Sequence, residues 1–188
     1  MSQTTSGLTP GITTPRAAAA VWVLLMAVVL QVSVLPHLAF RGVVADVVLL
    51  VVVAVGLRHG SEPAMVLGFA GGLLLDLVPP ADHVAGRWAL ALLVAGYVAG
   101  RVSGRAGRAG RAGSPRWPVL LGTVAACSFV ASSLFAVSGM VLRDPLVGVP
   151  ALLETVLVAV LSDVLLGALL VPLVLALDQR LEPDRLPA

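Results

Sequence analysis

Charged side chains are scarce in this chain. Only 12% of its 188 residues are Asp, Glu, Lys or Arg, aromatic residues make up 4%, and Lys is absent altogether. Apolar residues account for 59%, whereas a soluble domain averages about 45–50% apolar and about 25% charged residues. Because so few polar side chains cannot cover a water-soluble globule, the composition predicts an integral membrane protein. The formal net charge of +2 comes from arginines in predicted loops and does not favour nucleic-acid binding.

Cysteine is nearly absent as well. The single Cys127 lies within an apolar run, so it can form no intrachain disulfide and no CxxC metal or redox motif. The sequence also contains no HExxH, GxSxG or phosphate-loop spacing. We therefore expect no catalytic residue, no metal and no cofactor, and a protein that is not an enzyme.

Long apolar runs take up most of the chain and leave no room for a separate soluble domain. Six runs are predicted to be transmembrane helices of one all-α bundle, at residues 17–40, 43–59, 61–79, 88–102, 118–142 and 150–177. Residues 1–16 are predicted to be a disordered cytoplasmic tail, and residues 178–188 a second cytoplasmic tail. The second and third runs are short against a hydrocarbon core of about 30 Å, so re-entrant helices remain an alternative there.

The arginines predict the orientation, because basic residues in short loops are retained on the cytoplasmic side. With both termini inside, nine arginines lie inside and three outside. The inner set is Arg16, Arg58, Arg101, Arg105, Arg108, Arg111, Arg116, Arg180 and Arg185, and the outer set is Arg41, Arg87 and Arg143. The segment Gly104–Gly113 repeats Gly-Arg-Ala and is predicted to be a mobile loop.

Glycines follow a four-residue spacing in the third run. Gly68, Gly72 and Asp76 share one helix face, which offers a smooth groove to a neighbouring helix and then one acid at its end. Small-xxx-small spacing also occurs at Gly56/Gly60 and Gly96/Gly100. Packing within the bundle is the simpler interpretation of these glycines, and partner binding is the alternative.

Two acids flank the turn between the second and third runs. Asp46 and Asp76 each lie about 15 residues from Gly60 and Ser61, which places both near the outer boundary at one depth. We expect them to act together, either by sharing a proton or through a bridging cation such as Arg41, Arg87 or a basic residue of a partner. A hydrogen bond to nearby backbone and a role in transport are the alternatives.

Two further acids belong to the sixth run. Asp163 lies about midway along it, where a charge is costly, so we expect this carboxyl to be neutral or hydrogen-bonded inside the bundle. Ser132 and Ser133 of the fifth run lie at a similar depth and are its candidate partners. Glu154 is predicted to be a second buried polar residue, near the outer entrance.

The order of these motifs resembles the family of the rod-shape-determining membrane protein MreD. The resemblance covers roughly residues 30–100. It depends on Leu30-Gln31-Val32-Ser33 before Pro36, Ala45-Asp46-Val47-Val48-Leu49-Leu50, Gly68-Phe69-Ala70-Gly71-Gly72-Leu73-Leu74-Leu75-Asp76, and then Gly86, Ala89-Leu90 and Gly96-Tyr97. Where family members commonly have proline before the second-helix aspartate, this chain has Ala45.

The resemblance implies a non-enzymatic subunit of the cell-elongation machinery that guides peptidoglycan synthesis, located in the bacterial cytoplasmic membrane. Its implied partners are an MreC-like single-span scaffold, a RodA-type synthase with its transpeptidase, and indirectly MreB, besides membrane lipid and, as an open alternative, a second copy of the chain. The implied packing or partner-binding residues are Gly68, Gly72, Asp76, Asp46, Gly96, Tyr97 and Gln31.

The family is also similar in fold to the substrate-binding S components of energy-coupling-factor vitamin transporters, which supply the main rival function. In that interpretation the outer acids and Tyr97 line a small-molecule pocket. Few polar residues converge to recognise a vitamin, so this function ranks second. An intramembrane hydrolase ranks third, since no Ser/His or His/Asp spacing inside the runs supports it.

Overall fold

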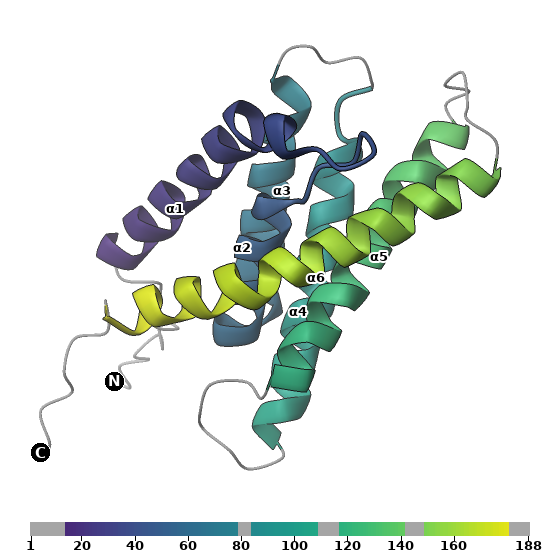
Figure 1. Ribbon diagram of the computed structural model, residues 1–188. Coiled ribbons are helices and arrows are strands. Elements are labelled where there is room, and N and C mark those ends of the chain that lie inside the picture. The colour runs from purple at the N-terminus through teal and green to yellow at the C-terminus, as the bar shows by residue number, and fades with distance from the viewer. Residues whose placement is uncertain (1–13, 79–83, 109–116, 142–148, 181–188) are drawn as a thin grey trace, which may run out of the picture.

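The computed structural model describes residues 14–78, 84–108, 117–141 and 149–180. These residues form six α-helices and one short 3₁₀ helix: α1 Thr14–Ser33, η1 Leu35–Leu38, α2 Val47–His59, α3 Ser61–Leu77, α4 Arg87–Arg108, α5 Trp117–Val141 and α6 Val149–Arg180. Successive α-helices alternate in direction, and α6 crosses the others obliquely (Figure 1). The predicted all-helical class is therefore correct for the described residues.

The first two predicted runs differ from helices α1 and α2 where the chain passes from one helix to the other. α1 stops at Ser33, because Pro36 in the following 3₁₀ turn has no N–H group with which to continue the α-helical ladder. Phe40 and Val43 then exchange backbone hydrogen bonds of 2.9 Å around a tight turn. Arg41 and Gly42 occupy the centre of that turn with φ values of 53° and 79°. As a result α2 begins at Val47, four residues later than residue 43.

The Gly-Arg-Ala segment also differs from its prediction. α4 continues through Gly104 and Gly107 to Arg108, where a loop was expected. Ala and Arg are strong helix formers and offset the cost of the interspersed glycines. Residues 109–113 of the segment and most of both predicted tails lie outside the described residues, while 14–16 and 178–180 belong to α1 and α6.

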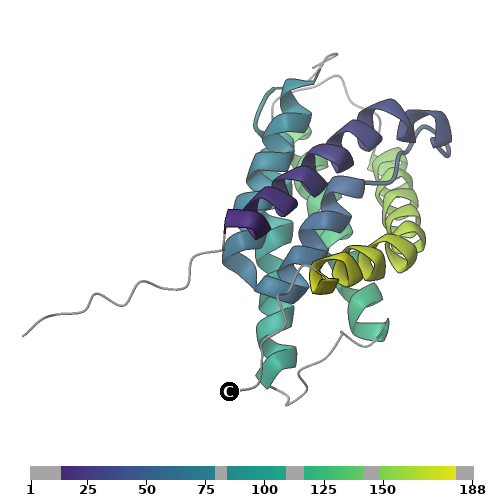
Figure 2. The same ribbon diagram turned by 90° about the vertical axis from the view of Figure 1, so that its left-hand side faces the viewer.

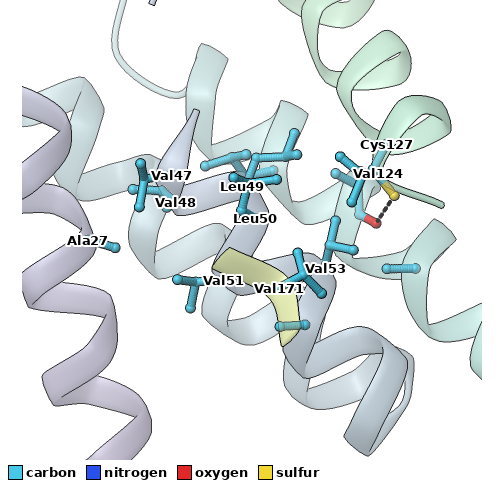
Figure 3. Close-up of a cluster of buried hydrophobic side chains, with 14 of the residues drawn as sticks. Ala27, Val47, Val48, Leu49, Leu50, Val51, Val53, Val124, Cys127 and Val171 are labelled. Atoms are coloured by element: carbon cyan, nitrogen blue, oxygen red, sulfur yellow. Dashed lines mark hydrogen bonds between the residues drawn. The ribbon is translucent and has the colours of Figure 1, made fainter. Parts of the chain in front are cut away.

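α2 is the centre of the bundle. Every residue from Val47 to Ala54 is buried, because α1, α3, α4, α5 and α6 all pack around this helix. Figure 3 shows the apolar cluster in which Val171 of α6 and Val124 of α5 approach the α2 side chains. In the same view the Cys127 thiol donates a hydrogen bond of 3.4 Å to the Ala95 carbonyl. Figure 2 shows α1 and α6 on separate sides of α2.

Glycines bring α3 and α4 into backbone contact along a seam. A Cβ built on Gly68 would lie 2.3 Å from the Leu92 carbonyl oxygen, and one on Gly72 would lie 2.4 Å from the Trp88 carbonyl oxygen. From the other side, a Cβ on Gly96 would lie 2.5 Å from the Ala64 carbonyl oxygen. These contacts involve backbone atoms, which cannot move aside as a flexible side chain can. The neighbour of the predicted glycine face is therefore α4 of the same chain.

Two helices are long and apolar enough to cross a membrane, Trp117–Val141 and Leu152–Arg180. In the most apolar 18-residue stretch of each helix, only 33% and 22% respectively is buried inside the protein. Both helices therefore present apolar side chains outward. Seven exposed leucines follow one another at four-residue spacing along α6: Leu153, Leu157, Leu161, Leu165, Leu169, Leu173 and Leu177. Such a continuous exposed apolar face is typical of contact with lipid or with another protein rather than with water.

We expect Gly72→Ala to destabilise the bundle by about 1–3 kcal/mol, because the new methyl group would overlap the α4 backbone. Gly122→Ala in α5 is the matched control, since a Cβ there meets nothing within 4 Å. A glycine-to-alanine change at an open helical position should add about 0.5–1 kcal/mol of stability. Thermal unfolding midpoints in detergent micelles measure both effects. Equal midpoints for the two variants would show that a methyl group at position 72 fits between α3 and α4 without displacing the α4 backbone.

Candidate functional site

The first turn of α2 is buried, although helix starts usually meet water. Asp46 is its N-cap, with an extended backbone conformation at φ −95° and ψ 92°, and is only 6% exposed. The Leu49 N–H donates a 2.9 Å hydrogen bond to Asp46 Oδ1. An aspartate at this position satisfies one of the four N–H groups that a helix start leaves without an intrahelical partner.

Neighbouring helices supply further acceptors. The Asp46 N–H donates to Asp163 Oδ1 of α6 at 2.6 Å, and the Val47 N–H donates to Gln31 Oε1 of α1 at 2.7 Å. The Ser128 hydroxyl of α5 donates to Asp163 Oδ2 at 2.6 Å. Gln31, Asp46, Ser128 and Asp163, called here the polar junction, therefore join α1, α2, α5 and α6.

The two carboxylates of the polar junction are unequally satisfied. Both oxygens of Asp163, which is 3% exposed, accept hydrogen bonds. Asp46 Oδ2 is buried and has no hydrogen-bond partner among the described residues. Because two adjacent ionised carboxylates repel one another, a negative charge on both Asp46 and Asp163 would be costly here.

Asp76 fulfils the corresponding role at the start of α4. Its carboxylate, which is 1% exposed as a residue, accepts hydrogen bonds from the Gly86, Trp88 and Ala89 N–H groups at 2.8, 3.1 and 3.1 Å. Gly86 adopts a φ of 103°, a conformation that L side chains rarely take, and this turns the chain into the helix. The acid at the end of α3 therefore fixes the start of α4.

Arg87 connects the same helix start to α5. Its Nη2 donates to the Phe135 carbonyl oxygen at 2.8 Å and its Nε donates to Ser138 Oγ at 3.1 Å. The guanidinium also lies 4.1 Å from the centre of the Phe135 ring, and the Trp88 and Phe135 rings are 4.5 Å apart. This buried arginine thus anchors α4 to α5, and its interactions combine hydrogen bonding with cation–π attraction.

Several expectations about these polar residues require correction. Asp46 and Asp76 each accept hydrogen bonds from backbone N–H groups at a helix start, which is the backbone alternative that the sequence left open. The serine that donates to Asp163 is Ser128, one turn before the expected Ser132 and Ser133. Hydropathy carries no information on which helix faces meet, so spacing alone could not select among these serines.

Glu154 was expected to be buried and is not. It forms an ion pair with Arg41 of the turn between α1 and α2, and its side chain is 58% exposed. α6 begins at Val149, and the exposed part of the helix around Leu153 and Glu154 lets the acid meet the turn between α1 and α2. Exposed ion pairs of this kind contribute little to stability.

Tyr97 and Gly96 lie on opposite sides of α4. Gly96 faces the backbone of Ala64 in the seam, whereas Tyr97 is 44% exposed and its ring lies 5.6 Å from the Arg101 guanidinium. Tyr97 therefore does not join Asp46 and Asp76 around a common pocket. The transporter interpretation expected Tyr97 to line a pocket with the two acids, but sequence spacing could not show the direction of the tyrosine side chain.

A polar hollow of about 420 Å³ opens at the opposite end of the bundle, beside the α2–α3 turn. Its wall consists of Arg58, His59, Gly60, Ser61, Gly100, Arg101, Ser103 and Gly104. Asp178 near the end of α6 lies 3.2 Å from both Arg58 Nε and His59 Nε2. Sequence reasoning missed this hollow, although two arginines near a glycine turn were visible in the sequence.

Comparison with protein-family models, curated proteins and solved structures finds no match to the chain. Within residues 14–78, 84–108, 117–141 and 149–180, no three His, Cys, Asp or Glu side chains gather closely enough to hold a metal ion. What the polar junction and the Asp76 cap visibly do is hold helix ends in place.

We expect Asp163→Leu to lower the free energy of unfolding by about 1–3 kcal/mol for each donor that loses its acceptor. The two donors are the Asp46 N–H and the Ser128 hydroxyl. Asp163→Asn should keep most of the stability, since its amide offers one acceptor and one donor. Asp46→Asn keeps an acceptor for the Leu49 N–H and should lose less stability than Asp163→Leu. Thermal unfolding midpoints in detergent test all three variants.

The control for Asp163→Leu is Glu154→Leu, an acid-to-leucine change at an exposed position of the same helix. It should shift the midpoint little, as expected for an exposed ion pair. If Asp163→Leu and Glu154→Leu gave the same midpoint, the polar junction would not stabilise the bundle.

Proposed function

We propose that the chain is a six-span protein of the bacterial cytoplasmic membrane with both termini in the cytoplasm. The outward apolar faces of α5 and α6 support this placement. At 32 residues α6 is about 48 Å long, so it fits a hydrocarbon core of about 30 Å only when tilted, as its oblique course in Figure 1 suggests. At 13 residues α2 is only about 20 Å long, which suits a helix that starts inside the bundle.

We further propose that the protein is a non-enzymatic subunit of the cell-elongation machinery. It would bind an MreC-like single-span scaffold and, with it, the RodA-type synthase and its transpeptidase, and act on MreB indirectly. One observation carries this proposal: five residues of the resemblance to the MreD family lie at contacts that hold the bundle together. Gln31 and Asp46 belong to the polar junction, Gly68 and Gly72 to the seam, and Asp76 caps α4.

The transporter function ranks second for a geometric reason. A vitamin-binding pocket would need the outer acids as free ligands, but backbone N–H groups occupy the Asp76 carboxylate and one oxygen of Asp46. Tyr97, the third expected pocket residue, faces outward. An S component therefore fits these residues less well than a packing subunit.

The orientation predicts a labelling pattern for single cysteines in a Cys127→Ser background. Val84→Cys, in the exposed segment before α4, should react with an impermeant thiol reagent in intact cells. Gly104→Cys, near the other end of α4, should react only after the cells are permeabilised. The reverse pattern would invert the orientation, and labelling of both positions in intact cells would contradict a full α4 span.

Loss of the gene in its own host should reduce the length-to-width ratio of the cells, as measured by light microscopy. Wild type and Gly122→Leu should restore the ratio, because Gly122 faces open space. Gly72→Leu should not, because its side chain would push α3 from α4. The single-span partner should co-purify with wild type in mild detergent and be lost with Gly72→Leu.

Two results would contradict the elongation role. One is unchanged cell shape after deletion, and the other is restoration by Gly72→Leu at wild-type protein levels. Loss of vitamin accumulation with normal cell shape would instead move the S-component function to first place.

A further inference from the structure

The hollow beside the α2–α3 turn combines residues from three helices. Arg58 and His59 end α2, Ser61 begins α3, and Arg101 and Ser103 lie on the last part of α4. Gly60 joins α2 to α3 with a φ of 91°, and nothing lies within 4 Å of a Cβ built there. Gly100 packs its backbone against Ser61, and beside this contact the wall surrounds an open hollow of about 420 Å³ that is lined by two arginines.

The wall of the hollow carries an excess of positive charge. Asp178 is shared by Arg58 and His59. Arg101 lies near the Tyr97 ring and forms no salt bridge within the described part of the chain. Glu62, the acid in the first turn of α3, is exposed and is not part of the wall. An anion entering the hollow would therefore meet at least one guanidinium without a carboxylate partner.

The start of α3 adds hydrogen-bond donors to this charge. Its N-cap, Gly60, offers no side-chain cap and Pro63 has no N–H, so Ser61 and Glu62 are the first residues of α3 whose N–H groups lack a capping side chain. Phosphate oxygens are well suited to such a site, because helix N-termini carry a partial positive charge and arginine binds phosphate through paired donors.

The surroundings of the hollow favour a ligand with an apolar portion. Tyr97 precedes Arg101 by one helical turn and is exposed, an arrangement typical of the boundary between headgroups and hydrocarbon. On α3, Val66 and Phe69 are also exposed and lie farther along the helix from Ser61. A polar headgroup in the hollow would thus leave its hydrocarbon chains against apolar side chains.

We propose that this hollow binds the phosphate headgroup of an anionic membrane lipid, with Arg101 and Arg58 as its cationic ligands. In the proposed orientation the hollow faces the inner leaflet, where basic pockets between helices bind acidic headgroups. The proposal goes beyond the role in cell elongation. It rests on the proposed orientation in the membrane, and it does not depend on any of the proposed partner proteins.

The test uses the full chain in nanodiscs that contain phosphatidylglycerol and phosphatidylcholine in equal amounts, with native mass spectrometry to count the lipids retained. Arg101→Ala should lower retained phosphatidylglycerol about fivefold, the effect of removing one basic contact. Arg180→Ala removes an exposed arginine outside the hollow and should leave retention close to wild type. Arg101→Lys should keep most of the binding. Thermal midpoints check that each variant is folded.

Three outcomes would overturn the proposal. Equal losses for Arg101→Ala and Arg180→Ala would indicate general surface charge, and equal retention of phosphatidylcholine would remove the need for an anionic headgroup. In the third, inorganic phosphate stabilises wild type but not Arg101→Ala in neutral detergent, while phosphatidylglycerol does not. That result would identify a site for free phosphate. Because none of these measurements involves cell shape, failure here leaves the elongation role to its own test.

Discussion

A helix that starts inside a bundle must find acceptors for its first N–H groups, and at α2 this requirement decides how four helices meet. Asp46 caps the helix from within, Gln31 reaches it from α1, and Asp163 reaches it from α6 with Ser128 behind it. In an apolar environment an unpaired N–H group costs several kcal/mol, on the order of the worth of a whole helix contact. α1 and α6 lie where their side chains supply acceptors to the start of α2, and α5 lies where Ser128 donates to one of those side chains.

The start of α4 meets the same requirement with a different geometry. Asp76 reaches from the end of α3 to three N–H groups, and the glycine seam then holds α3 and α4 together along their length. Arg87 extends this unit to α5. Buried acids would be costly as isolated charges. Here they accept hydrogen bonds from the N–H groups of helix starts inside the bundle, which lowers the cost of burying those groups.

Helix number and the glycine face were predictable from the sequence, because both depend on local runs and four-residue spacing. The start of α2 was not, since residues 43–46 are nearly as apolar as the helix they precede and only the cap geometry separates them. The contact between Asp46 and Asp163 spans 117 residues, and hydropathy does not encode which faces of distant helices meet. The exposure of Glu154 and the hollow beside the α2–α3 turn also depend on which faces of distant helices meet.

The polar junction also orders events during synthesis. Asp163 follows Asp46 by 117 residues, so at about 5–20 residues per second it emerges roughly 6–23 s later. Until then the start of α2 lacks one of its acceptors, and the first helices form an incomplete assembly. A chain terminated before α6 would keep an unsatisfied helix start, a feature that distinguishes unfinished from finished copies.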